Sequence, residues 1–190
     1  MTKKLGQLGE LLPGYQLRTA IEPNPAGRYA LLRLGDVKRN ADWSALPRMD
    51  LDLSAERSQI IDGDVLCRSR GGNYQAAVVE GIWMATVALA PLYVFRPDPK
   101  RVLAGYVAWW LNSYEAQAEI ESAAVGTNIQ TVPIRAFESL SIPVVPLELQ
   151  AKMVEVHQLS WRIEELESDL AHKRSEFVER SLEKLARRAP

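Results

Sequence analysis

The residue types that most often do chemistry in proteins occur in this sequence without a complete set of partners. His157 and His172 lie fifteen residues apart in one helix-forming segment, and no third metal ligand stands at a recognisable spacing from them. Asp62 and Asp64 flank Gly63, but aspartates before a strand more often accept hydrogen bonds from the backbone of a turn. No glycine-rich phosphate loop, nucleophile elbow or amino-methyltransferase motif occurs either. We therefore expect no catalytic residue, no metal site and no cofactor.

A different chemistry is indicated by polar residues beside a glycine turn. Gly71 and Gly72 favour a tight turn, and five residues around them carry donors and acceptors: Arg68, Ser69, Arg70, Asn73 and Tyr74. Arginine can donate two hydrogen bonds to guanine O6 and N7, and asparagine can pair with adenine in the same way, while both also bind phosphate. The segment predicts either a contact with DNA or a solvated hairpin.

A second polar segment follows Gly126, a glycine placed to end a helix. Its predicted DNA-contacting residues are Thr127, Asn128 and Gln130, with helix termination or a loop hydrogen bond as the alternative role of Asn128. Further cations lie in an irregular segment nearer the N-terminus, where no individual role can be assigned: Arg28, Arg33, Lys38 and Arg39.

The two polar segments lie within a region whose apolar residues change once from strand-like to helical spacing. Residues 29–96 consist of short apolar runs separated by Gly and Pro, which predicts mainly β structure. From Arg101 to about Ala124 apolar residues recur at helical spacing, which predicts one amphipathic helix on the sheet. Tyr106 and the Trp109–Trp110 pair belong to that pattern, so we assign them to the core. Two prolines at 143 and 146 then end a predicted α/β (α+β) domain over residues 1–146.

Residues 147–190 form a separate predicted helix. No Pro or Gly occurs between Pro146 and Pro190, and apolar residues recur every seven positions. The predicted seam consists of Leu149, Val156, Leu159, Ile163, Leu166, Leu170 and Phe177. From 149 to 177 a helix measures about 42 Å, which is longer than a small domain can cover. We predict a coiled-coil dimer interface, with folding back on the domain as the alternative.

The composition is that of an ordinary folded protein. The 190 residues carry 23 Lys and Arg against 24 Asp and Glu, so a DNA-binding surface must be local rather than the result of net charge. Cys67 is the only cysteine, which fits a reducing compartment and predicts a cytoplasmic protein. No signal peptide and no apolar run long enough to span a membrane is apparent.

The order of these segments resembles the specificity subunits of type I restriction-modification systems. The resemblance covers essentially the whole chain and depends on Gly-Asp-Val-Leu at 63–66, the turn at Gly71, a helix ending near Asn112, the 126–130 loop, and Ile-Pro-Val-Val-Pro at 142–146 followed by Gln150. None of these motifs is specific alone.

The resemblance implies a target-recognition domain for double-stranded DNA, joined to a helix that pairs with a counterpart. It also implies a DNA methyltransferase subunit, and possibly a restriction (motor-nuclease) subunit, as partners that supply the chemistry. Family members carry two recognition domains and two such helices, whereas this chain has one of each. A homodimer on a bipartite symmetric site is the expected arrangement. The alternatives are a coiled-coil interaction module without DNA binding, or a recognition-domain fragment of a fused methyltransferase or nuclease.

Overall fold

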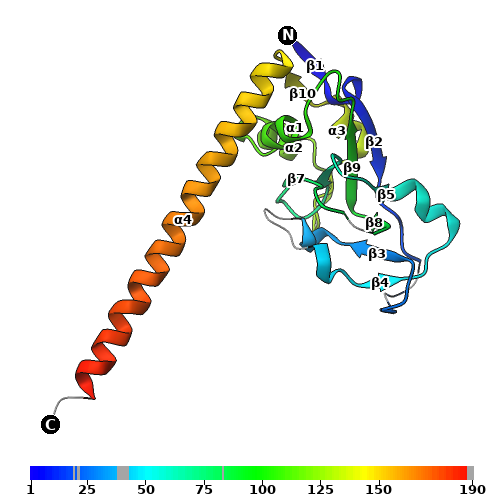
Figure 1. The fold of residues 1–190 in the computed structure, drawn as a ribbon. Helices are drawn as coiled ribbons and strands as arrows, with labels where there is room; N and C mark the ends of the chain where they lie inside the picture. The colour runs from blue at the N-terminus through cyan, green and yellow to red at the C-terminus, as the bar shows by residue number, and fades with distance from the viewer. Residues whose placement is uncertain (19, 21, 38–42, 83, 188–190) are drawn as a thin grey trace. The chain divides into compact units, whose positions relative to one another are not determined.

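The computed structural model describes residues 1–18, 20, 22–37, 43–82 and 84–187, and Figure 1 shows their arrangement. The chain divides into two compact units, Met1–Ala151 and Lys152–Pro190. The strands are β1 (Thr2–Lys4), β2 (Gly9–Pro13), β3 (Tyr29–Leu32), β4 (Arg48–Met49), β5 (Gln59–Ile60), β6 (Val65–Arg68), β7 (Ala76–Val78), β8 (Thr86–Ala88), β9 (Leu92–Pro97) and β10 (Ser141–Pro143). The helices are α1 (Ala104–Leu111), α2 (Tyr114–Ser122), α3 (Ile134–Ser139) and α4 (Leu147–Ala186), and short 3-10 turns are η1 (Leu5–Gln7), η2 (Leu34–Asp36), η3 (Trp43–Ala45) and η4 (Leu53–Ser58). The predicted α/β class with a long C-terminal helix is confirmed.

Two four-stranded sheets and one strand pair build the first unit. One sheet has the order β2-β9-β6-β7 and is antiparallel throughout. The other has the order β4-β3-β8-β5, in which the central pair β3 and β8 is parallel. β1 pairs with β10, so the two ends of the first unit's sequence are hydrogen-bonded to each other.

The parallel strands β3 and β8 are buried on both faces. Leu32 of β3 and Ala88 of β8 belong to a core cluster that also contains residues of β6 and β9. Leu31 and Val87, one residue earlier in each strand, belong to a second cluster on the opposite face. Neighbouring residues of a strand point to opposite faces, so a run of apolar residues without alternation is what a doubly covered strand requires.

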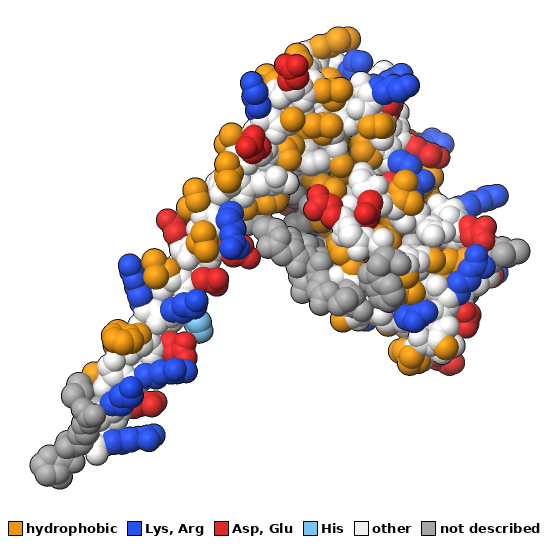
Figure 2. All heavy atoms as spheres, viewed as in Figure 1, with side chains coloured by type: hydrophobic (Ala, Val, Ile, Leu, Met, Phe, Trp, Pro, Cys, Tyr) orange, Lys and Arg blue, Asp and Glu red, His pale blue; other side chains and the backbone are white. Residues whose placement is uncertain are grey.

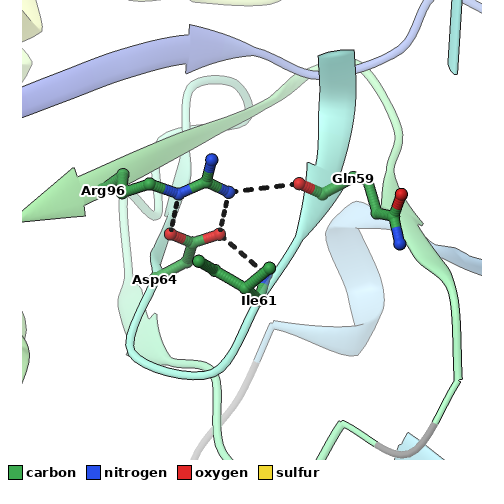
Figure 3. A network of polar contacts seen from close by, with 4 residues as sticks. All are labelled: Gln59, Ile61, Asp64 and Arg96. Carbon is green, nitrogen blue, oxygen red and sulfur yellow. Dashed lines mark hydrogen bonds and ion pairs between the residues drawn. The ribbon is translucent and has the colours of Figure 1, made fainter. Parts of the chain in front are cut away.

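A buried ion pair fixes the start of β6, the strand that leads into the first predicted DNA segment. Arg96 donates to both carboxylate oxygens of Asp64 at 2.8 Å and to the carbonyl of Gln59 at 3.2 Å (Figure 3). Asp64 also accepts from the Ile61 N–H at 2.9 Å, as predicted for a turn aspartate. The hydrogen bonds to Asp64 raise the pKa of the Arg96 guanidinium. The network joins β5 of one sheet to β6 and β9 of the other.

The prediction of one helix from Arg101 to Ala124 is wrong, because the chain breaks there into α1 and α2. Ser113 is in an extended conformation and caps α2, accepting a hydrogen bond from the Ala116 N–H at 3.3 Å. The side chain of Asn112 accepts from the Ala76 N–H at 2.9 Å and donates to the Ala76 carbonyl at 2.8 Å. Asn112 thus pairs with the edge strand β7 as a neighbouring strand would. The predicted core position of Tyr106 is confirmed, since its ring is buried and its hydroxyl donates to the Pro143 carbonyl. Trp109 and Trp110, assigned to the core with it, are only half-buried.

The first turn of α4 is held by one buried side chain. Gln150 is fully buried, and its amide accepts from the Leu103 N–H at 2.9 Å and donates to the Val145 carbonyl at 2.8 Å. A buried amide must satisfy its donors and acceptors, so these bonds fix residues 147–151 within the first unit. α4 begins directly after the predicted boundary at Pro146.

The whole of α4 is 40 residues long, and the second unit contains all of it after Ala151. Ion pairs one turn apart support it, with Arg162 bound to Glu165 at 2.6 Å and Arg180 bound to Glu176. None of the helices in the described part of the chain is both long enough and apolar enough to cross a membrane.

Candidate nucleic-acid interface

The two polar segments singled out in the sequence lie together in the structure. The first loop comprises residues 69–75, between β6 and β7, and the second loop comprises residues 125–131, between α2 and α3. The Gly71 N–H donates to the Gln130 carbonyl at 3.2 Å, and the Val132 N–H donates to the Ser69 carbonyl at 2.8 Å. An isolated antiparallel bridge also joins Arg70 to Thr131. Residues about sixty positions apart in the sequence therefore form one surface, which we call the paired loops.

Glycine is required at defined points of the paired loops. Gly71 and Gly72 have positive φ angles of 94° and 72°, which any other residue adopts only with strain. In the second loop Gly126 has a φ of 119°, and a Cβ there would lie 2.7 Å from the Ile129 carbonyl oxygen. The turn predicted at Gly71 is confirmed. Gly126 closes the second loop rather than the helix, since α2 already ends at Ser122.

The hydrogen-bonding side chains of the paired loops are largely exposed. Among the predicted residues, the exposed ones are Arg70, Asn73, Thr127, Asn128 and Gln130. Val125 and Ile129 are also exposed, each to 59%, so the surface offers apolar contacts beside its polar groups. Guanidinium and amide groups of this kind can form hydrogen bonds with base edges or with phosphate.

Arg70 of the paired loops and Arg68, which ends β6 just before the first loop, differ from Arg28 and Arg33. Arg28 pairs with Glu56 at 3.4 Å and Arg33 pairs with Asp36 at 3.3 Å, so acidic side chains offset both charges. Within residues 1–18, 20, 22–37, 43–82 and 84–187, no ion pair is formed by Arg68 or Arg70. Arg68 is half-buried, and its Nε is buried without a hydrogen-bond partner in this part of the chain. The paired loops therefore carry positive charge that is available to an anion.

Two of the predicted DNA-contacting residues have buried side chains in the structure. Ser69 is 1% exposed and donates its hydroxyl to the Pro91 carbonyl. Tyr74 is also 1% exposed, and burial raises the pKa of its hydroxyl, as does the nearby charge of Glu121. Both side chains stabilise the loop from beneath, because they point to the buried side of a segment whose neighbours Arg70 and Asn73 point outward. Lys38 and Arg39 lie outside the described residues.

Three supporting residues were missed by the sequence reasoning. Thr131 contacts Arg70, Asn112 pairs with Ala76 after the first loop, and Gln117 donates to the Tyr74 carbonyl at 3.1 Å. Each acts on a segment more than thirty residues away in the sequence, so no local pattern reports it. The break before Ser113 had a detectable signal, because serine is a preferred N-cap residue.

The predicted seam of α4 is exposed in the single chain. The exposed fractions of its side chains are 46% at Leu149, 67% at Val156, 57% at Leu159, 57% at Ile163, 50% at Leu166, 49% at Leu170 and 72% at Phe177. Val178 and Leu182 extend the apolar surface toward the C-terminus. Figure 2 shows hydrophobic side chains along the helix among charges of both signs. His157 stacks near Trp161, with ring centroids 3.8 Å apart. In the described part of the chain, no cluster of three His, Cys, Asp or Glu side chains suits a metal ion.

No protein-family model matches the chain, and no curated protein matches it in sequence. Its fold does match solved structures. The S subunit of a type I restriction-modification system from M. genitalium aligns with a TM-score of 0.59 and 18% identity, over 88% of this chain and 41% of that one. The HsdS subunit from Thermoanaerobacter tengcongensis aligns with a TM-score of 0.60 and 20% identity, over 88% and 38%.

A chain from a structure concerned with complex assembly and conformational transition of the type I restriction-modification system aligns with a TM-score of 0.66 and 19% identity. That alignment covers 93% of this chain and 42% of the other. The present chain thus spans about two fifths of the length of each chain that it matches. The resemblance found in the sequence is confirmed at the level of the fold: the chain has the fold of the type I restriction-modification S subunits, over about two fifths of their length.

Proposed function

We propose that this chain is a non-catalytic DNA specificity subunit of a type I restriction-modification complex. The observation that carries the proposal is the pairing of the two loops, which gathers Arg70, Asn73 and Asn128 on one exposed surface beside the unpaired charge of Arg68. Arginine and asparagine are the side chains that discriminate guanine and adenine in the major groove. Methyl transfer and any cleavage belong to separate methyltransferase and restriction subunits.

Two copies act together in this proposal, joined through α4. A row of seven apolar side chains that stays about half exposed in one chain is covered when a second helix packs on it. Each Leu, Ile or Phe buried in this way stabilises the dimer by roughly 1.5–3 kcal/mol. A two-fold dimer reads an inverted repeat, with a spacer between the half-sites that neither copy reads.

The charges within the seam favour antiparallel helices. Lys152, Lys173 and Arg180 stand three residues after Leu149, Leu170 and Phe177, where the heptad pattern calls for an apolar residue. In a parallel pair each of these cations would face its own copy, and three such layers repel. In an antiparallel pair with Ile163 facing Leu166 of the second copy, Lys173 faces Val156. Lysine can then lay its aliphatic stem along the apolar residue.

The antiparallel arrangement also sets a length scale for the DNA. With that register the two Leu147 residues lie at opposite ends of the helix pair. The distance between them is roughly 50 Å, at a rise of about 1.5 Å per residue. This distance corresponds to on the order of 15 base pairs of duplex DNA, at about 3.4 Å each. The target is therefore expected to be a bipartite site of that order rather than a compact one.

The proposal is tested by selecting bound duplexes from a random library with the purified full-length chain, at several salt concentrations. The expected result is an inverted repeat with one preferred spacer, bound less tightly as salt rises. Coexpression with the methyltransferase subunit should then methylate adenines at the same site in genomic DNA. A dimer that retains no duplex even at low salt would contradict the proposal and favour a protein-interaction module. Binding of a methyl-donor cofactor by the isolated chain would instead favour a fragment of a fused enzyme.

A further inference from the structure

Thr131 lies at the centre of the paired loops. Its backbone exchanges two hydrogen bonds with Val125, both at 2.9 Å, and it forms an isolated antiparallel bridge with Arg70. Its side-chain hydroxyl accepts a hydrogen bond from the Arg70 Nε at 3.2 Å. The hydroxyl is held in place by this backbone and by the stiffness of a β-branched side chain at χ1.

This contact determines which part of Arg70 is left for a ligand. A guanidinium carries one Nε–H and four terminal N–H donors. Thr131 occupies the Nε–H, and no described residue of the chain forms a hydrogen bond or ion pair with the terminal nitrogen atoms of Arg70. Those two nitrogen atoms form the fork that matches O6 and N7 of guanine. Arg70 is itself exposed, so the fork is accessible.

An exposed arginine without such a contact samples many rotamers and loses that freedom when it binds. Ordering one flexible side chain at an interface costs about 0.5–1.5 kcal/mol. A hydrogen bond to Nε made in the free protein removes part of this cost before DNA arrives. It also excludes the side-on approach, in which Nε and one terminal nitrogen would meet the base.

We propose that Thr131 is a positioning residue for base recognition, which holds Arg70 by its Nε and presents the terminal fork to a guanine. The inference rests on the proposed function, since it names how one arginine of the paired loops reads DNA. Thr131 itself touches no base in this arrangement.

The test measures binding of the full-length chain to its selected duplex and to the same duplex with single base pairs replaced. Thr131→Val keeps the shape, the β-branching and both backbone hydrogen bonds but removes the hydroxyl, and Thr131→Ser restores the hydroxyl. We expect Thr131→Val to weaken binding of the dimer to the selected duplex by about fivefold, or about twofold for each copy, because the contact removes part of the cost of ordering one side chain in each. It should also reduce the preference at the base pair that Arg70→Ala affects, and Thr131→Ser should bind nearly as the natural chain does.

The double variant Arg70→Ala with Thr131→Val separates positioning from a general structural role. If Thr131 acts through Arg70, the double variant binds no more weakly than Arg70→Ala alone. An additional fivefold loss in the double variant would overturn the inference, as would natural affinity of Thr131→Val when Arg70→Ala is weakened. Thr131→Ala serves as a second hydroxyl-free variant if the valine variant unfolds at a lower temperature. If Arg70→Ala itself leaves affinity and base preference unchanged, the assignment of Arg70 in the proposed function fails, and this result is distinct from the other two.

Discussion

The carboxylate of Asp64 accepts hydrogen bonds from Nε and one terminal nitrogen of Arg96, and the aspartate side chain is fully buried while that of the arginine is about one third exposed. Removing the charge from one partner leaves the other desolvated and unpaired, which costs more than the pair itself contributes. We expect Asp64→Asn to lower the free energy of unfolding by about 2–3 kcal/mol, below the range for fully buried pairs because water reaches Arg96. Urea titration measures the change. Glu56→Gln is the matched control, because Glu56 and its partner Arg28 are both exposed and the variant should change stability by less than about 1 kcal/mol.

The buried thiol of Cys67 should make the stability of the folded chain depend on pH in the alkaline range. Burial raises the pKa of its thiol from 9.0 to about 12, so the unfolded thiol ionises first as the pH rises. The resulting stabilisation of the folded state is complete below pH 9 and is lost between pH 9 and 12. Between pH 9 and 10 the natural chain should lose about 1 kcal/mol relative to Cys67→Ala. Because both chains contain the same buried tyrosines, whose pKa values are also raised, the contribution of the tyrosines to the pH dependence cancels in this comparison. Equal pH profiles for both chains would show that the folded thiol ionises normally.

The dimer interface is tested on the seam of α4. Asp at both Ile163 and Leu170 places two charges in the apolar layer, and we expect light scattering to report monomers at concentrations where the natural chain is dimeric. Asp at both Ser168 and Ser175 adds the same charge on the opposite face of the helix and should leave the dimer intact. A dimer that survives the first pair of changes would place the interface elsewhere.

The orientation of the helices is tested by crosslinking. Chains with Ile163→Cys and chains with Leu166→Cys, carrying different tags, are mixed and oxidised. In the antiparallel register these two cysteines face each other across the pair, so the crosslinked product should contain both tags. A parallel pair would instead give products with one tag only, because each cysteine would face its own copy.

DNA binding is tested on the exposed residues of the paired loops and on Arg68, which directly precedes them. We expect Arg70→Ala to cost about 1–3 kcal/mol for each half-site of the selected duplex and to relax the preference at one base pair in each half-site. A contact to phosphate behaves differently: Arg68→Ala should weaken binding to all sequences and lower the salt slope by roughly one unit if Arg68 binds the backbone. Asymmetric changes in the two half-sites would contradict a homodimer. Unchanged binding after replacing Arg68, Arg70, Asn73, Asn128 and Gln130 in turn would show that another surface binds DNA.

The features that follow local rules could be predicted from the sequence. The turn at Asp62–Asp64, the glycine turn at 71–72 and the long helix after Pro146 each depend on neighbouring residues, because backbone sterics and helical periodicity act over a few positions. The two helices within 101–124 were predicted as one for the same reason. Apolar spacing continues across Asn112 and Ser113, and it outweighed the local N-cap signal of Ser113. The contact of Asn112 with Ala76, which also holds the break between α1 and α2, is tertiary.

The composition of the paired loops could be predicted in part. Arg70 and Asn73 were identified because of their residue types, but the same argument included Ser69 and Tyr74, which are buried. A turn points some of its side chains inward, and residue type alone does not say which. The partner of Arg96 and the role of Thr131 depend on contacts 32 and 61 residues away, and a single sequence holds no record of such distances.

The bridge between Arg70 and Thr131 has a consequence for engineering. Gly71 of the first loop donates a backbone hydrogen bond to the second loop, and Val132, directly after the second loop, donates one to Ser69. Neither loop can therefore be exchanged alone without losing the partner that shapes it. If residues 69–75 were replaced by those of a related chain, the new first loop would pack against the unchanged second loop, and the backbone bridge between the two loops would not fit. New sequence preferences should therefore be transplanted as a matched pair, residues 69–75 together with 125–131, rather than as a single segment.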